Sequence, residues 1–441
     1  VGTVTITVKN VNYSLSYGTF TITVSSLIDV DDTDYDYYKT KILSIDETGY
    51  KMELLNVPEV YLSPNAEYVK WDGSKVIPSS LDDLYIGLEN VYVAVGRQSK
   101  MIKKVLLDQE IGFRNIRVAI RKNINDIADN SSIYHDYISF TMYSDAILQT
   151  FDGINHFFLS SGSEVVITVV NNKMKFVVNG VDLFETDKRV IFDPDYSISF
   201  NTITRGNRRI PIYEGNLEVS MVKGRMLVVN DIDLESYLTK VVPSEMPASW
   251  NLEALKSQAV AARTYAYMDI LNKSNDRYGY TVDDSTKSQV YNNSDADYRS
   301  TEAIYQTQGL IMTYEDKPVQ AFYYSASSGL TASGHEVWIQ DKVTEEIPYL
   351  IGKNLTLDDN DKAIEYDYQD EASMLAFFKQ IRMYTPDTNS PYHRWRVMMS
   401  FQQLAETINT NLRITYNNAP DSVLTKVGNE WESKPIPTNI G

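Results

Sequence analysis

Alternation of apolar and polar residues constrains the fold of this chain more than any other feature of its sequence. Residues 3–8 and 19–24 alternate threonine with valine, isoleucine or phenylalanine, and a period of two is typical of half-buried β-strands. No helical period of any length interrupts the first hundred or so residues. We therefore expect residues 1–110 to form an all-β module.

Turn residues divide the β pattern into short strands. Asp72-Gly73 separates two strand-like runs, Glu67–Trp71 and Ser74–Ile77, and tolerates the positive φ angles of a two-residue hairpin turn. A second β-rich stretch extends from about residue 115 to residue 230. The strands predicted there are Ile116–Arg121, Ile138–Ser144, Val165–Val170, Met174–Val178, Val181–Phe184, Asn216–Met221 and Arg225–Val229.

The pattern becomes helical at Asp233, a residue type that suits an N-cap. Apolar residues recur on one helical face over Leu234–Val242, and Pro243 follows them. A second helix is expected after Asn251, with leucines, alanines and Ile270 in one stripe. The remaining predicted elements are a helix over Tyr298–Gln308 that ends at Gly309, a hairpin of Leu310–Tyr314 with Val319–Tyr324, helices over Glu371–Tyr384 and Phe401–Leu412, and a terminal strand pair.

Strands and helices are therefore segregated along the chain rather than alternating, which predicts an α+β fold. We expect the all-β module of residues 1–110 to be followed by a β-rich domain over 111–441. A few inserted helices would line a cleft in that second domain.

Composition excludes several classes of function. The 441 residues include 41 lysines and arginines against 59 aspartates and glutamates, a formal net charge of −18, which disfavours a nucleic-acid-binding face. The absence of cysteine removes disulfides, thiol nucleophiles and cysteine-ligated zinc. No apolar run approaches the roughly 20 residues of a membrane-spanning helix, so we expect no transmembrane segment.

Glu245 is the strongest local candidate for chemistry. It lies between Pro243 and Pro247, and prolines on both sides disfavour a continued helix. We therefore expect a rigid loop that presents a partly desolvated carboxyl group, whose raised pKa would suit a general acid. The alternative from the residues alone is an ordinary exposed loop glutamate.

The helix after Glu245 carries possible partners for an acid. Lys256 and Arg263 are seven residues apart and share a helical face, with Tyr267 beside them. Such cations could orient the acid or bind anionic groups of a substrate. The alternative is a surface stripe whose long side chains lie along the helix with their charges in water.

A series of motifs resembles the stage II sporulation protein D family, also described as the SpoIID/LytB domain. The matching blocks, in family order, are Val229–Leu238, Val241–Pro247, Trp250 and Glu253–Ala266, Asp284–Thr286 with Gln289–Tyr291, Thr307–Leu310, Ala321–Tyr323 with Ser327–Gly329, Glu336–Trp338 and Pro348–Leu350. Looser similarity begins at Ile116 and extends to Trp395, so the resemblance covers about residues 111–441.

The resemblance implies a lytic transglycosylase, a lyase that cleaves peptidoglycan between N-acetylmuramic acid and N-acetylglucosamine and leaves a 1,6-anhydro end. Glu245 matches the family's catalytic acid/base. Such an enzyme needs one carboxylate, whereas an ordinary glycosidase needs two. The later blocks imply substrate contacts from Lys256, Gln258, Arg263, Tyr267, Ser327 and Trp338, and no cofactor.

The sequence departs from the family pattern in two places. Some family members bind zinc through cysteine and histidine near the Asp-Ser-Thr block and after the hairpin. Here those positions read Thr286–Gln289 and Ser325–Ser328, so we expect no metal. The family usually continues with a further β segment beyond the position of Gly441, so we also expect the C-terminal strands to be truncated.

The resemblance predicts an extracytoplasmic protein at the cell wall of a Gram-positive, spore-forming bacterium, with glycan strands as its partner. A second hypothesis is a non-catalytic wall-binding protein that enhances a separate N-acetylmuramoyl-L-alanine amidase. A third treats residues 1–110 as an independent module that binds glycan or a protein partner.

Overall fold

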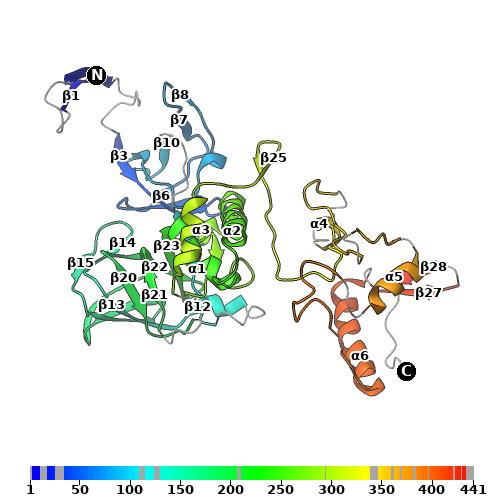
Figure 1. Ribbon diagram of the computed structural model, residues 1–441. Helices are drawn as coiled ribbons and strands as arrows, with labels where there is room; N and C mark the ends of the chain where they lie inside the picture. The colour runs from blue at the N-terminus through cyan, green and yellow to red at the C-terminus, as the bar shows by residue number, and fades with distance from the viewer. Residues whose placement is uncertain are drawn as a thin grey trace. The chain divides into compact units, whose positions relative to one another are not determined.

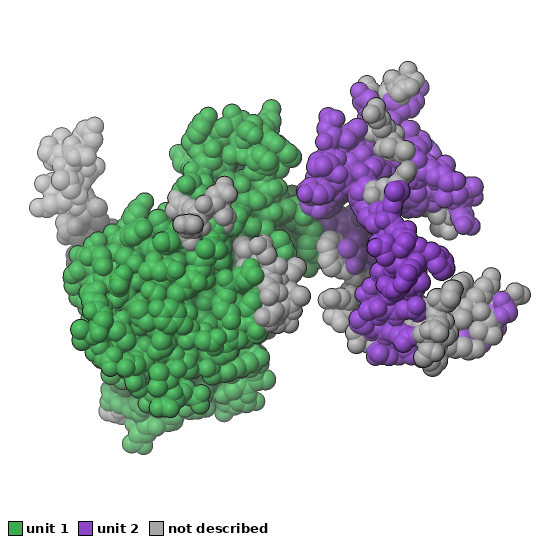
Figure 2. Space-filling model, turned by 90° about the horizontal axis from the view of Figure 1, so that it is seen from below, with its two compact units in different colours: residues 1–323 green, residues 324–441 purple. Residues whose placement is uncertain are grey.

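A computed structural model describes most of the chain. The described residues are 2–9, 17–24, 34–108, 115–123, 130–205, 210–293, 295–337, 346–358, 362–367, 370–380, 384–395, 397–420, 423–428 and 430–433. They fall into two compact units, Val1–Tyr323 and Tyr324–Gly441 (Figure 2). The predicted boundary near residue 110 lies inside the first unit and stays a prediction.

The N-terminal region is built from strands, as the alternation predicts. β1 (Gly2–Lys9) and β2 (Tyr17–Val24) form an antiparallel pair. A five-stranded sheet has the order β3-β9-β10-β7-β8, and a three-stranded sheet has the order β4-β5-β6. The bounds are β3 Tyr35–Thr40, β4 Ile42–Asp46, β5 Lys51–Leu54, β6 Val60–Tyr61, β7 Glu67–Trp71, β8 Val76–Pro78, β9 Val91–Gly96 and β10 Ile102–Leu107, with a short 3-10 helix at Leu81–Asp83.

The hairpin of β7 and β8 is confirmed, but its turn is longer than predicted. Pairing ends at Trp71 and Val76, which leaves a four-residue loop. The Asp72 carboxylate accepts hydrogen bonds from the backbone N–H groups of Ser74 and Lys75 at 2.9 and 2.8 Å. These side-chain bonds stabilise the longer loop in place of a two-residue turn.

Two larger sheets face each other across the main hydrophobic core (Figure 1). The edge-to-face pair Phe140–Phe192, with ring centroids 5.4 Å apart, joins one strand of each sheet. One sheet has the order β15-β14-β19-β22-β23-β11-β24, with β12 also paired to β23, and the other has the order β18-β17-β16-β13-β20-β21. The bounds are β11 Asn115–Ala119, β12 Tyr134–His135, β13 Tyr137–Met142, β14 Ala146–Thr150, β15 His156–Leu159, β16 Glu164–Val170, β17 Lys173–Val178, β18 Val181–Thr186, β19 Val190–Pro194, β20 Ser197–Phe200, β21 Ile212–Glu214, β22 Asn216–Val222, β23 Arg225–Asp233 and β24 Val282–Asp283, with a 3-10 helix at Asn130–Ile133.

Three helices pack together beside strand β23, as the pattern after Asp233 predicts. They are α1 (Leu234–Glu245), α2 (Leu252–Asn272) and α3 (Tyr298–Gln306), with a 3-10 helix at Asp276–Tyr278 between the last two. Both predicted N-caps are confirmed. The Asp233 carboxylate accepts from the N–H of Ser236 at 2.9 Å, and the Asn251 side chain accepts from the N–H of Glu253 at 2.9 Å.

The prediction that Pro243 ends the first helix is wrong. Pro243 lies inside α1, and helical bonding continues past it because the N–H of Met246 donates to the carbonyl of Val242 at 2.9 Å. A proline in the last turn removes one backbone donor without preventing the bonds that follow it. Glu245 is therefore the last residue of a helix and not part of a loop.

The second unit combines short elements around Tyr366 and Phe377. Its bounds are α4 Gly334–Val337, α5 Glu371–Lys379, α6 Phe401–Asn418, β27 Leu424–Val427 and β28 Glu430–Ser433. The predicted terminal strand pair and both predicted helices are confirmed, but α5 ends five residues before its predicted end, and α6 extends six residues beyond its own. The predicted 310–324 hairpin, in the first unit, is shorter than expected, with β25 at Thr313–Tyr314 and β26 at Lys317–Pro318.

Among the described residues, no helix combines the length and the hydropathy that crossing a bilayer requires.

A buried arginine joins the strands of the large sheet. Arg117 on β11 is fully buried, and its guanidinium donates to Glu218 on β22 at 2.9 and 2.5 Å and to Asp231 on β23 at 2.6 Å. Its Nε donates to the carbonyl of Gly279 at 2.8 Å. Paired carboxylates of this kind compensate the cost of burying a charge.

The same carboxylates bind the N-terminal β region. Lys41 contacts Asp231 at 2.7 Å, and Arg189 bridges Glu218 at 3.1 Å and Glu53 at 2.8 Å. A Cβ atom on Gly279 would lie 2.6 Å from the Arg189 guanidinium, so this glycine permits the close approach. The ion network therefore connects the N-terminal sheets to the sandwich.

Replacing Arg117 with methionine should destabilise the first unit strongly, because Glu218 and Asp231 would remain buried without their main cation. We expect a loss of about 3–5 kcal/mol in the free energy of unfolding, measured by urea denaturation. The control Lys51→Met breaks an exposed pair with Glu59 and should cost less than about 1 kcal/mol. Equal effects of the two substitutions would contradict the role assigned to the network.

Candidate active site

Glu245 lies at the point where α1 ends, and two donors hold its carboxyl group. Its side chain is half-buried, and Oε1 accepts the backbone N–H of Val290 at 2.8 Å. The hydroxyl of Tyr323 also hydrogen-bonds the carboxylate. Both donors are far from Glu245 in sequence, so the tertiary fold orients this carboxyl group.

A buried glutamine sets the direction of the hydroxyl that contacts Glu245. The Gln289 amide is fully buried and donates from Nε2 to the Tyr323 hydroxyl at 2.9 Å and to the carbonyl of Ala262 on α2 at 3.1 Å. Its oxygen accepts from the hydroxyl of Tyr237 on α1 at 3.3 Å. Because the amide nitrogen can only donate, the Tyr323 hydroxyl must accept there, and its own proton is left for Glu245.

The pKa of Glu245 is raised above its ordinary value. Burial is the largest cause, because it disfavours the charged carboxylate, while the Val290 N–H and the Tyr323 hydroxyl act in the opposite direction. The carboxyl group also lies at the C-terminal end of a helix, where the helix dipole disfavours negative charge. A raised pKa keeps part of the population protonated closer to neutral pH, which a general acid requires.

The two cations predicted to assist Glu245 have other partners. Arg263 is buried, and its guanidinium forms a two-pronged pair with Glu235 on α1 at 2.8 and 2.7 Å. Lys256 pairs with Glu253 at 2.7 Å on the exposed side of α2. Neither has a recorded contact with Glu245 in the described structure. Arg263 therefore holds α1 and α2 together, and its assignment to substrate binding stays a prediction.

The other predicted substrate-binding residues are dispersed. Gln258 on α2 is 9% exposed, and its Nε2 has no hydrogen-bond partner among the described residues. Tyr267 is half-buried and influences the pKa of Tyr85, which belongs to the N-terminal β region. Ser327 lies in the second unit, where His393 Nδ1 bonds its carbonyl at 3.0 Å. Trp338 lies outside the described residues.

Gln289 and Tyr323 are the functional candidates that sequence reasoning missed. Both lie inside blocks of the family resemblance, Gln289–Tyr291 and Ala321–Tyr323, and this position was the feature of the sequence that could have identified them. Their residue types did not identify them, because a lone glutamine and one of 32 tyrosines carry no local pattern. Within the described residues, no group of three or more histidine, aspartate or glutamate side chains is arranged to hold a metal ion.

Comparison with known proteins finds a family match that covers β23 and the three helices α1, α2 and α3. Residues 222–314 match the family model described as stage II sporulation protein. The chain is 34% identical over 195 residues to an uncharacterised protein of Brachyspira hyodysenteriae, covering 44% of this chain and 49% of that protein. It is 40% identical over 136 residues to the stage II sporulation protein D of Bacillus amyloliquefaciens, covering 28% and 38%.

A third relative has a different name. The amidase enhancer of Bacillus subtilis is 40% identical over 121 residues, covering 27% of this chain and 15% of that protein. The chain thus spans about half the length of the first of these relatives and a smaller share of the others.

Replacing Tyr323 with phenylalanine should raise the pKa of Glu245 further, because the ionised carboxylate loses one of its two donors. A carbon-13 NMR titration of the glutamate carboxyl groups in the full chain measures this pKa. The matched control is Tyr305→Phe on α3, where the ring is 73% exposed, and it should leave the titration unchanged. A fall in the pKa of Glu245 after Tyr323→Phe would show that the hydroxyl does not stabilise the carboxylate.

Proposed function

We propose that this chain is a cell-wall enzyme of the stage II sporulation protein D family, a lytic transglycosylase that cleaves peptidoglycan glycan strands, because residues 222–314 match that family's model. The main support for this proposal is the environment of the Glu245 carboxyl group. Its carboxyl group is half-buried, is held by donors from two distant segments and has a raised pKa.

One carboxyl group is sufficient for the proposed reaction. Protonated Glu245 donates its proton to the glycosidic oxygen between N-acetylmuramic acid and N-acetylglucosamine, and the bond from that oxygen to C1 breaks. The C6 hydroxyl of the same muramic acid attacks C1, and the Glu245 carboxylate takes up the hydroxyl proton. The product has a 1,6-anhydro ring, the acid is regenerated and no water is consumed. A hydrolase would need a second carboxylate beside the bond.

The surrounding residues support each half of this cycle. Burial favours the protonated acid that starts the reaction, and the Tyr323 hydroxyl and the Val290 N–H stabilise the carboxylate that forms next. The Gln289 amide fixes the direction of the Tyr323 proton. Substrate contacts from Lys256, Gln258, Arg263, Tyr267, Ser327 and Trp338 remain part of the proposal.

Two of the matched proteins are sporulation proteins of Bacillus species, which supports a Gram-positive, spore-forming bacterium as the source. The proposed reaction adds a location outside the cytoplasmic membrane. A glycan-cleaving enzyme must reach the wall, and the proposed location meets that requirement.

A second function has its own supporting observation. The 40% identity to an amidase enhancer covers 121 residues, so we also propose, as the alternative, that the chain stimulates a separate N-acetylmuramoyl-L-alanine amidase without cleaving glycan itself.

Glu245→Gln should lower glycan cleavage by about 10²–10⁴-fold, because glutamine can neither donate nor accept the proton. Mass spectrometry of sacculi digested with the unaltered chain should find 1,6-anhydromuramic acid ends, and sacculi treated with the Glu245→Gln variant should lack them. Since Glu245 acts first as an acid, the rate should fall as pH rises above its raised pKa. Reducing ends in place of anhydro ends would identify a hydrolase and refute the proposed mechanism.

The alternative predicts that Glu245→Gln stimulates a purified cell-wall amidase as strongly as the unaltered chain does. Release of stem peptides from sacculi, measured with and without the chain, reports the stimulation. Stimulation that disappears with Glu245→Gln would contradict the non-catalytic alternative.

A further inference from the structure

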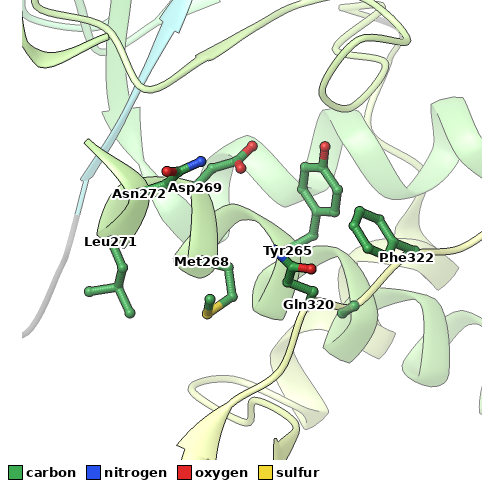
Figure 3. A pocket seen from close by; sticks show the side chains of 8 residues that line it. Tyr265, Met268, Asp269, Leu271, Asn272, Gln320 and Phe322 are labelled. Carbon is green, nitrogen blue, oxygen red and sulfur yellow. The ribbon is translucent and has the colours of Figure 1, made fainter. Parts of the chain in front are cut away.

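A cavity of about 230 Å³ lies beside the second half of α2 (Figure 3). Its wall is formed by α2 and by the segment 320–322, and the lining residues are Tyr265, Met268, Asp269, Leu271, Asn272, Gln320, Ala321 and Phe322. The hydrogen bonds of Glu245 come from Val290 and Tyr323, neither of which lines this cavity. The cavity is therefore separate from the reaction proposed above, and no role assigned so far uses it.

Polar side chains follow one stripe of α2 along the cavity. Asp269 and Asn272 lie four and seven residues after Tyr265, a spacing that places all three on one helical face. In Figure 3 the Tyr265 ring and the Asp269 side chain extend to the same side of α2. Asp269 is half-buried, whereas Asn272 and Gln320 are exposed. A carboxyl group thus lies within the cavity, and two amide groups lie at its edge.

These polar groups have no hydrogen-bond partners in the described part of the chain. None is recorded for the side chains of Tyr265, Asp269, Asn272 and Gln320. An ionised carboxylate only accepts hydrogen bonds, whereas an amide side chain and a phenol both donate and accept them. A ligand that satisfies all four must therefore carry several groups that donate and accept. Hydroxyl groups have this property.

Two aromatic rings form the apolar part of the cavity. The rings of Tyr265 and Phe322 have centroids 6.3 Å apart and planes at 69° to each other. Rings at this angle cannot enclose a flat base between parallel faces. They suit a pyranose ring, because its C–H groups can lie against the negative face of an aromatic ring.

The size and the charge of the cavity exclude other classes of ligand. Sites for drug-sized molecules measure roughly 300–1,000 Å³, so this smaller cavity holds one ring rather than an oligomer. None of the described lining residues is a lysine, an arginine or a histidine, so an anionic group would meet Asp269 without a counter-ion. An alkylammonium ion would neutralise Asp269 but would offer no acceptor to the amides of Asn272 and Gln320.

We propose that this cavity binds one pyranose ring of a neutral saccharide. The Asp269 carboxylate accepts hydrogen bonds from two neighbouring hydroxyl groups, and the amides of Asn272 and Gln320 bond hydroxyl groups at the edge of the ring. Tyr265 and Phe322 pack against its C–H groups. The inference goes beyond the proposed transglycosylase and does not depend on it, because binding here involves no step at Glu245.

The test is a ligand-observed NMR titration of the full chain at pH 8 with glucose, galactose, mannose and N-acetylglucosamine. Burial raises the pKa of Asp269 to about 7, so most of its carboxyl groups are ionised at this pH. At least one of the four sugars should bind with a dissociation constant of about 1–10 mM, as expected for a ligand with so few atoms.

Asp269→Asn should weaken this binding by at least about tenfold, because the sugar hydroxyl groups lose a charged acceptor. The matched control Glu302→Gln removes one exposed negative charge from α3 and should leave the affinity unchanged. Phe322→Leu should also weaken binding, because leucine fills the space but offers no aromatic face. Circular dichroism of each variant verifies that the chain stays folded.

Three outcomes would overturn the proposal. Equal weakening by Glu245→Gln and Asp269→Asn would place the sugar at Glu245 and remove the separate site. Tighter binding of n-butylammonium than of every sugar would replace the saccharide by a cation. Failure of all four sugars to bind at concentrations up to about 50 mM, well above the expected dissociation constant, would remove the site.

A methyl glycoside of the sugar that binds distinguishes the two sources of a pyranose ring. Retained affinity identifies the end residue of a saccharide chain as the ligand, and lost affinity identifies a free monosaccharide. Because no probe contains the bond that Glu245 would cleave, sugar binding that depends on Asp269 in a chain that cleaves no glycan would uphold this site and reject the transglycosylase.

Discussion

The contact of Arg117 with Glu218 and Asp231 is the constraint on which the rest of the first unit depends. A fully buried guanidinium is tolerable only with its carboxylates in place, and these lie on the neighbouring strand β23 and on β22 beyond it. Asp231 also binds Lys41, which ties the N-terminal sheets to the same point. Strand β23 ends two residues later at Asp233, the N-cap of α1. The ion network therefore fixes the origin of the helix whose last residue is Glu245.

A second buried cluster fixes the segment that approaches Glu245 from the other side. Arg205 donates from Nε to the Asp284 carboxylate at 2.8 Å, and the backbone N–H of Arg121 donates to it at 3.0 Å. Asp284 lies a few residues before Gln289 and Val290, which orient the Tyr323 hydroxyl and the Glu245 carboxyl group. Buried ion pairs therefore fix the start of the helix that carries Glu245 and the segment that carries Gln289 and Val290. Apart from Glu245 itself, the hydrogen-bonding groups of the site are neutral. Such a site is oriented before any ligand arrives, as catalysis by one acid/base requires.

Local pattern by itself determined the β character of the N-terminal region and the sandwich with some of their strands, the two N-caps at Asp233 and Asn251, and the apolar faces of α1 and α2. These depend on periods of two and 3.6 residues, which neighbouring residues alone carry. The same local reasoning wrongly ended α1 at Pro243, because the bonds of the last turn depend on the helix as a whole. It singled out Glu245, but only the tertiary structure decided that Val290 and Tyr323 hold it and that Arg263 pairs with Glu235. Those contacts join segments 28 to 45 or more residues apart, and no pattern in neighbouring residues encodes a contact over that distance.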